Sequence, residues 1–276
     1  MADLHSIASE LGSSLVEARP LAGGFSHSTS LVTLTDGQVV VRSGGAAPRA
    51  EAAVMDLARA HVPVPSVLLV RDDVLVIEYV AGELLVPSSH ALGVEVGQVV
   101  AAIGEVRFDR PGFFAGPDLT VAPERPWSSQ LVEVVSSCLA ATSRLDASTR
   151  DAWLALCSEH APALSAVDGV ARLVHADVNP KNLLVSGGRV VAVLDWEFSY
   201  VGCPYGDAAN MLRFDSAGPF GDGFREGFGL TDEAAYLGRV LDMFALSDLL
   251  TRDASNPIAD RAAAVIREWV RTGIPR

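Results

Sequence analysis

The chain has 276 residues, of which 49% are hydrophobic and 20% charged, enough to build one large folded core. Its net charge of -13 argues against a nucleic-acid-binding protein and is compatible with a cationic substrate. No apolar run approaches the roughly 20 residues that span a bilayer, and the N-terminus lacks the features of a secretory signal, so we expect a cytoplasmic protein without a membrane segment.

The N-terminal part predicts strands and a glycine loop. Strands are expected over 15–21, 31–35 and 38–42, and Asp36-Gly37 predicts a type I′ turn because both residues tolerate positive φ angles. The loop over 21–28 contains two adjacent glycines, whose backbone amides can approach phosphate oxygens because no side chain intervenes. A plain β-turn explains the same loop equally simply.

A helix is predicted over 48–60, because Ala50, Val54 and Leu57 share one face. Glu51 on this helix either pairs with a basic side chain or points into solvent. A strand over 74–80 then leads into Ala81-Gly82, which we interpret as a linker. Later apolar periodicities and capping residues predict a mainly helical C-terminal part, with helices over 90–107, 127–139, 152–164, 231–250 and 257–272.

The most informative segment is 173–185, which contains Asp177 and Asn182 and is followed by Asp195. Gly187-Gly188 predicts a hairpin turn that brings Asp195 back toward the other two side chains. Phosphoryl transfer needs an oriented hydroxyl and metal ions that neutralise phosphate oxygens. Asp177 can orient the hydroxyl and take its proton, whereas Asn182 and Asp195 offer the hard oxygen ligands that Mg²⁺ prefers.

This segment resembles the catalytic loop of the aminoglycoside phosphotransferase family, which is related to the protein kinases. The match is His175-x-Asp177-x-x-x-x-Asn182 followed by Asp195-Trp-Glu197. We expect His175 to brace the loop by hydrogen bonding. The segment 201–209 is also similar to a family segment that opens the next helix, and the resemblance implies that Asp207 braces the catalytic loop.

The resemblance implies an α+β, bilobal, protein-kinase-like fold. Residues 1–80 would form a nucleotide-binding lobe with an antiparallel sheet and a helix, and residues 81–276 a mainly helical catalytic and acceptor-binding lobe. Lys181 is the only lysine and lies in the catalytic loop, so a phosphate-binding cation in the first lobe must be arginine. The residues implied in binding ATP or GTP are Gly23, Gly24, Phe25, Ser26, Arg42, Glu51, Glu78, Tyr79 and Val80.

The sequence is less specific about the acceptor. Acids downstream of the metal loop could bind an amine-bearing molecule, although ordinary surface acids explain each one as well: Glu197, Asp215, Asp222 and Glu226. The leading interpretation is a small-molecule O-phosphotransferase that uses ATP or GTP with Mg²⁺ and inactivates an antibiotic, an aminoglycoside or another cationic compound.

Three other interpretations stay open. A sugar, amino-alcohol or amino-acid kinase of metabolism would share every residue named so far. A catalytically inactive kinase-like protein that binds a ligand is disfavoured by the presence of Asp177, Asn182 and Asp195. A protein kinase is disfavoured by Asp195-Trp-Glu197 and by the lack of a following Ala-Pro-Glu segment.

Overall fold

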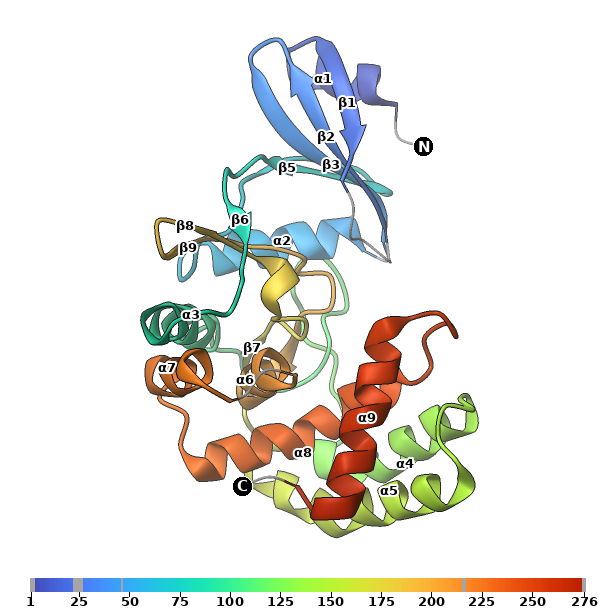
Figure 1. The fold of residues 1–276 in the computed structure, drawn as a ribbon. Helices are drawn as coiled ribbons and strands as arrows, with labels where there is room; N and C mark the ends of the chain where they lie inside the picture. The colour runs from blue at the N-terminus through green and yellow to red at the C-terminus, as the bar shows by residue number, and fades with distance from the viewer. Residues whose placement is uncertain (1–2, 22–26, 46, 215–216, 275–276) are drawn as a thin grey trace.

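The computed structural model describes residues 3–21, 27–45, 47–214 and 217–274. The N-terminal part is an antiparallel sheet in the order β1-β2-β3-β5-β4. Helix α1 packs on one face of this sheet, and α2 lies on the side toward the rest of the chain (Figure 1). The elements are α1 (Leu4–Glu10), β1 (Leu15–Pro20), β2 (His27–Leu34), β3 (Gly37–Gly44), α2 (Pro48–Ala58), β4 (Val67–Val70) and β5 (Val74–Glu78).

The turn between β2 and β3 differs from the predicted one. Leu34 pairs with Gly37, so the two turn residues are Thr35 and Asp36, one position earlier than expected. Neither Asp36 nor Gly37 has the positive φ angle that a type I′ turn over these residues requires. The Thr35 N–H instead donates to the carbonyl of Ser14 (3.0 Å), so tertiary contacts fix this turn.

The C-terminal part combines short sheets with helices. Strand β6 pairs with β8, which forms a hairpin with β9, and β7 pairs with β10. The predicted hairpin turn at Gly187-Gly188 is confirmed, with φ angles of +57° and +79°. The elements are β6 (Glu83–Leu84), α3 (His90–Ile103), α4 (Trp127–Ala140), α5 (Ala147–His160), η1 (Ala161–Ala166), β7 (Arg172–Val174), η2 (Pro180–Asn182), β8 (Leu183–Ser186), β9 (Arg189–Val193), β10 (Tyr200–Gly202), α6 (Tyr205–Leu212), α7 (Pro219–Phe228), α8 (Asp232–Leu249) and α9 (Pro257–Thr272).

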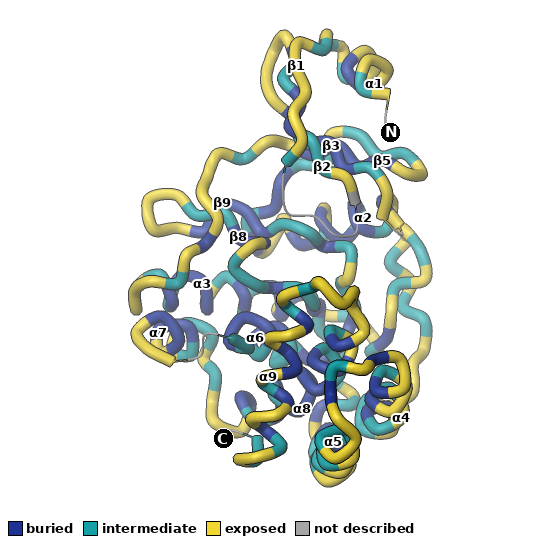
Figure 2. The backbone as a smooth tube through the Cα atoms, turned by 45° about the vertical axis from the view of Figure 1, so that its right-hand side comes forward, coloured by how far each residue is buried: buried dark blue, intermediate teal, exposed yellow. Residues whose placement is uncertain are grey.

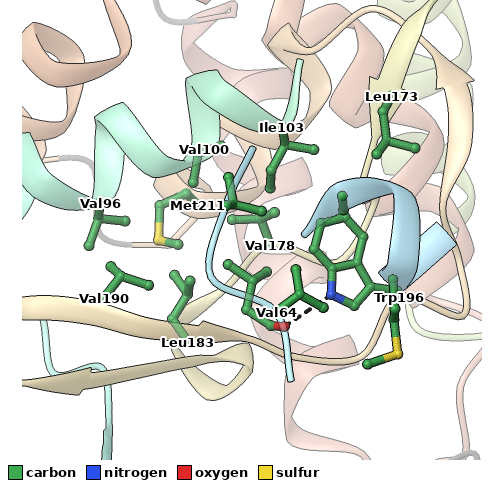
Figure 3. Packing of buried hydrophobic residues seen from close by; sticks show 14 of the residues in the cluster. Val64, Val96, Val100, Ile103, Leu173, Val178, Leu183, Val190, Trp196 and Met211 are labelled. Carbon is green, nitrogen blue, oxygen red and sulfur yellow. Dashed lines mark hydrogen bonds between the residues drawn. The ribbon is translucent and has the colours of Figure 1, made fainter. Parts of the chain in front are cut away.

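A hydrophobic cluster joins the N-terminal and C-terminal parts. Met55 of α2 and Ile77 of β5 belong to the same buried cluster as Leu183 and Trp196. The Trp196 indole is 1% exposed, and its N–H donates to the carbonyl of Val193 (3.0 Å; Figure 3). A second cluster fills the space among α4, α5, α8 and α9. Figure 2 shows the resulting buried layers below the sheet.

Helices α3 and α7 pack unusually closely through glycine. A Cβ atom added to Gly97 of α3 would lie 2.4 Å from the Phe224 carbonyl oxygen, and one added to Gly223 of α7 would lie 2.1 Å from the His90 carbonyl oxygen. Both helices carry a second glycine four residues away, Gly93 and Gly227, with equally close backbone neighbours. The two helices therefore touch backbone to backbone, which only glycine permits. None of the described helices has both the length and the apolar character needed to cross a membrane.

Candidate active site

The loop over residues 175–182 holds the Asp177 carboxylate in a fixed orientation. The Asn179 amide donates to Asp177 Oδ1 (2.8 Å), and the Asn182 amide donates to Asp177 Oδ2 (2.8 Å). Both amides also donate to the Asp177 carbonyl oxygen. The Lys181 ammonium lies 3.3 Å from Oδ2, and the Asp177 side chain is still 23% exposed. Asp177 is thus immobilised but accessible, as a group that orients a hydroxyl must be.

The side chains of His175 and Asp207 hold the backbone of this loop by hydrogen bonds. The Asp207 carboxylate accepts the backbone N–H groups of His175 and Ala176, both at 2.8 Å. His175 Nε2 lies 2.9 Å from the Leu194 carbonyl oxygen, and its Nδ1 accepts the Asp177 N–H (3.2 Å). Since a carbonyl can only accept, the proton lies on Nε2, and burial lowers the pKa of His175, which keeps the ring neutral.

The backbone is strained at two positions of the site. Ala176 has a φ of 69° and Asp195 a φ of 68°, a left-handed conformation that is uncommon for residues other than glycine. The bonds from Asp207 to the Ala176 N–H and from Asn210 to the Ala176 carbonyl (2.9 Å) hold the first of these in place. Such strain persists where surrounding contacts overdetermine it, as at functional sites.

Asp207 makes the stability of the protein depend on pH. Burial raises the pKa of its carboxyl from the ordinary 3.8 to about 7, although two backbone donors act in the opposite direction. The folded state therefore binds more protons than the unfolded chain between these values, and the free energy of unfolding should fall as pH rises through that window and level off above it. We expect a larger fall between about pH 5 and about pH 8 in the wild type than in Asp207→Asn, measured by urea titration. Equal changes in the two proteins would contradict this assignment.

Arg42 links the sheet to the end of the β8–β9 hairpin. Its guanidinium group donates to Glu51 and, at 2.8 Å, to Asp195 Oδ1. Glu51 is 7% exposed and also accepts the Trp196 backbone N–H (3.2 Å). Burial raises the pKa of Glu51 and Arg42 opposes that rise. Of the two roles left open for Glu51, the structure therefore shows the paired one.

Asn182 and Asp195 each keep one oxygen of the kind that Mg²⁺ binds. Because the side-chain nitrogen of Asn182 donates hydrogen bonds to Asp177, the Asn182 oxygen Oδ1 is the atom left for a metal. Asp195 uses Oδ1 for Arg42 and retains Oδ2, and its side chain is 21% exposed. One carboxylate and one amide oxygen suit Mg²⁺, which takes its other ligands from water and substrate phosphates.

Of the other residues predicted to bind the nucleotide, the structure describes those at the end of β5 but not those of the glycine loop. Glu78 ends β5, and its N–H and carboxylate both bond to the backbone of Ser66 (2.8 and 3.1 Å). Tyr79 is 39% exposed, and Val80 follows it toward β6. The predicted loop residues Gly23, Gly24, Phe25 and Ser26 lie outside the described residues.

The three described acids expected at the acceptor do not converge. Glu197 Oε2 would lie 3.5 Å from a Cβ atom added to Gly45, so this carboxylate faces the segment between β3 and α2. Asp222 and Glu226 are on α7, where Glu226 contacts His90 of α3 at 3.3 Å, at the α3–α7 edge of the molecule (Figure 1). Asp215 lies outside the described residues. This placement gives Asp222 and Glu226 no support as acceptor ligands.

Sequence reasoning missed two residues that shape the loop. Asn179 fixes Oδ1 of Asp177, and Asn210 holds the Ala176 carbonyl. Asn179 follows Asp177 by two residues, a spacing at which asparagine commonly bonds to local backbone. Asn210 lies three residues after Asp207 and therefore on the same face of α6. Both spacings were visible in the sequence.

Comparisons with known proteins bear on the family and the fold of the chain. A model of the phosphotransferase enzyme family matches residues 17–242. A thermostable mutant of aminoglycoside phosphotransferase APH(4)-Ia, in a ternary complex with ADP and hygromycin B, has a TM-score of 0.76 at 17% identity, with 100% of both chains covered. A candidate fructosamine-3-kinase from Thermobifida fusca has a TM-score of 0.67 at 18% identity, covering 96% of this chain and 99% of the other. At these identities the two structures establish the fold alone.

Acyl-CoA dehydrogenase family member 10 of Mus musculus is 30% identical over 236 residues, which cover 74% of this chain. The chain spans only 21% of the length of that relative. The structural likenesses confirm the predicted protein-kinase-like fold, and the family match confirms the predicted kinase-type enzyme class. Because the family model covers most of the sequence, the chain belongs to the phosphotransferase enzyme family.

Proposed function

We propose that this phosphotransferase moves the γ-phosphate of ATP or GTP to a hydroxyl group of a small, cationic molecule in the cytoplasm, and that its use is antibiotic inactivation. The observation that carries the proposal is the accessible Asp177 carboxylate, fixed by Asn179 and by the same Asn182 whose oxygen is left for a metal. The net charge of -13 favours a cationic acceptor.

The nucleotide would lie between the residues 1–80 and the residues 81–276, which we propose as the two lobes. Arg42 would bind its phosphates, and the backbone of residues 78–80 would face the base. Asn182 and Asp195 would hold Mg²⁺, which neutralises charge on the phosphate oxygens when it is bound. Arginine offers a planar fork for phosphate oxygens, so Arg42 suits this role.

In the proposed reaction Asp177 accepts a hydrogen bond from the acceptor hydroxyl and aligns its oxygen with the γ-phosphorus. The bond from that oxygen to phosphorus forms while the bond from phosphorus to the bridging oxygen of the nucleoside diphosphate breaks. The hydroxyl proton passes to Asp177. His175 and Asp207 do not take part in these steps and keep the loop in its strained conformation.

The test is mass spectrometry of candidate acceptors after incubation with the protein, Mg²⁺ and either ATP or GTP. The panel contains aminoglycosides, macrolides, cyclic peptide antibiotics and nucleoside antibiotics. Gain of one phosphoryl group by an antibiotic, dependent on Asp177, supports the proposal. Magnesium-dependent nucleotide binding without transfer to any compound would instead support an inactive ligand-binding protein.

A metabolic kinase is the second candidate, favoured by two comparisons. One structural likeness is to a candidate fructosamine-3-kinase, and the curated relative is named as a member of the acyl-CoA dehydrogenase family. The panel therefore includes fructosamines, sugars, amino alcohols and hydroxylated acyl-CoA thioesters. Phosphorylation confined to one of these classes would replace the antibiotic assignment and leave the phosphotransfer chemistry unchanged.

A further inference from the structure

Lys181 is the only lysine in the chain. Its side chain lies beside the Asp177 carboxylate of the proposed site. It is the middle residue of η2, whose first turn is capped by the Asn179 side chain, which accepts the Lys181 N–H (3.1 Å). The ammonium group lies 3.3 Å from Asp177 Oδ2, and half of the side chain is exposed. Every other basic side chain apart from histidine is an arginine.

The ion pair is not needed to hold Asp177 in place. The amides of Asn179 and Asn182 already bind one carboxylate oxygen each at 2.8 Å, and both also bind the Asp177 carbonyl. An ion pair with a half-exposed partner contributes little to stability. Lys181 therefore adds a half-exposed positive charge beside a carboxylate that other hydrogen bonds already position.

The reaction geometry gives that charge a partner. A hydroxyl bonded to Asp177 has its oxygen about 3 Å from the carboxylate, and the attacked phosphorus lies about 3–3.5 Å beyond that oxygen. A lysine side chain whose ammonium already contacts the same carboxylate can reach the phosphoryl oxygens by rotating its flexible four-carbon stem. The transition state spreads negative charge over those oxygens.

We propose that Lys181 is a catalytic residue that contacts the γ-phosphoryl group and stabilises its negative charge during transfer. It forms and breaks no covalent bond, because the proton goes to Asp177 and the leaving group is the nucleoside diphosphate. This inference rests on the proposed phosphotransfer function. It gives the loop a cation from the acceptor side, whereas Arg42 approaches from the sheet.

The presence of a single lysine allows a direct test with sulfo-N-hydroxysuccinimide acetate. Acetylation of the Lys181 peptide is followed by mass spectrometry with Mg²⁺ alone, with Mg²⁺ and ADP, and with Mg²⁺ and AMP-PNP, and calorimetry confirms saturation by each nucleotide. If calorimetry shows that guanine nucleotides bind better than adenine nucleotides, GDP and GMP-PNP replace ADP and AMP-PNP. We expect several-fold slower acetylation with AMP-PNP than with ADP, because only the former carries a γ-phosphate. Lys181→Arg, which removes the target, identifies the labelled peptide.

The possible outcomes separate the two proposals. Equal acetylation rates with both bound nucleotides would overturn the role of Lys181 and leave the proposed function intact. Failure of every nucleotide to bind would overturn the proposed function and this inference together. Protection by the triphosphate analogue alone supports both.

Kinetics provide an independent measurement on the same residue. Lys181→Met should lower kcat about 10- to 100-fold, less than the roughly 10²- to 10³-fold cost of losing one transition-state donor in a water-excluded site, because the lysine is half exposed. Lys181→Arg should restore part of kcat, and nucleotide affinity should change little in either variant. Release of phosphate from ATP to water serves as the assay until an acceptor is known.

Arg189→Met is the matched control. Arg189 forms a comparable ion pair with Glu95 (3.2 Å), its side chain is 77% exposed, and it lies at the start of β9 away from the loop. Both methionine variants should unfold at nearly the wild-type temperature, and only Lys181→Met should lose turnover. Wild-type kcat in Lys181→Met would overturn the inference.

Discussion

Replacing Asp177 by asparagine should lower kcat about a thousandfold while nucleotide affinity stays close to that of the wild type. A positioned general base contributes roughly 10²- to 10⁴-fold to a rate, and asparagine cannot accept the hydroxyl proton. The NH₂ group of the new side chain must also face a hydrogen-bond donor, either the Asn179 amide or the Asn182 amide and Lys181. Two donors cannot bond to each other, so one hydrogen bond that orients the side chain is lost.

The measurement is steady-state phosphate transfer to an acceptor found in the panel, with calorimetry of Mg²⁺-nucleotide binding alongside it. Asp72→Asn is the control, because it makes the same chemical change to a carboxylate that is 92% exposed and paired with Arg49. If Asp177→Asn keeps a kcat near that of the control, Asp177 does not activate the acceptor. If it loses nucleotide binding as well, the loop has been displaced.

Gly97→Ala should destabilise the folded protein by about 3 kcal/mol, the upper part of the usual cost of overpacking a core. The added methyl group would meet the Phe224 carbonyl oxygen at 2.4 Å and the Phe228 nitrogen at 2.7 Å, and neither backbone atom can rotate away. Helices α3 and α7 would have to separate. In an exposed helix the same change would instead stabilise by about 1 kcal/mol.

Gly206→Ala is the matched control, since Gly206 is also helical and the nearest atom to its added Cβ is the hydroxyl oxygen of Tyr200 at 3.7 Å, an ordinary contact. Urea unfolding of both variants measures the difference. We expect a lower free energy of unfolding for Gly97→Ala and little change or a gain for Gly206→Ala. A Gly97→Ala protein as stable as the wild type would mean that α3 and α7 do not pack this closely.

The sequence predicted those parts of the fold that depend on local patterns. The helix from Trp127 and the helix after Thr231 are found where apolar spacing and capping place them, because both signals act within a few residues. Helix α7 was not predicted, since its glycines weaken local helix propensity. Those glycines are explained only by contact with α3, more than a hundred residues away in sequence.

In the site, too, features set by local spacing were predictable, whereas features set by residues distant in sequence were not. The spacing of Asp177 and Asn182 was enough to predict that their side chains lie together, and in the structure they are hydrogen-bonded. Spacing could not choose between a paired and an exposed Glu51, because its partners come from β3 and from Trp196 in the other half of the chain. The left-handed backbone at Ala176 is equally invisible, since alanine has no preference for that conformation and distant Asp207 and Asn210 impose it.

The cluster that joins Met55 and Ile77 to Leu183 and Trp196 has a consequence for how the molecule can be divided. Cutting the chain at the linker would leave the N-terminal fragment with the underside of α2 in water, and the other fragment with an uncovered Trp196. Exposed apolar surface of that kind promotes aggregation. The part of the chain that holds the five-stranded sheet and α2 is therefore not an independent folding unit, although its secondary structure is distinct from that of the helical part.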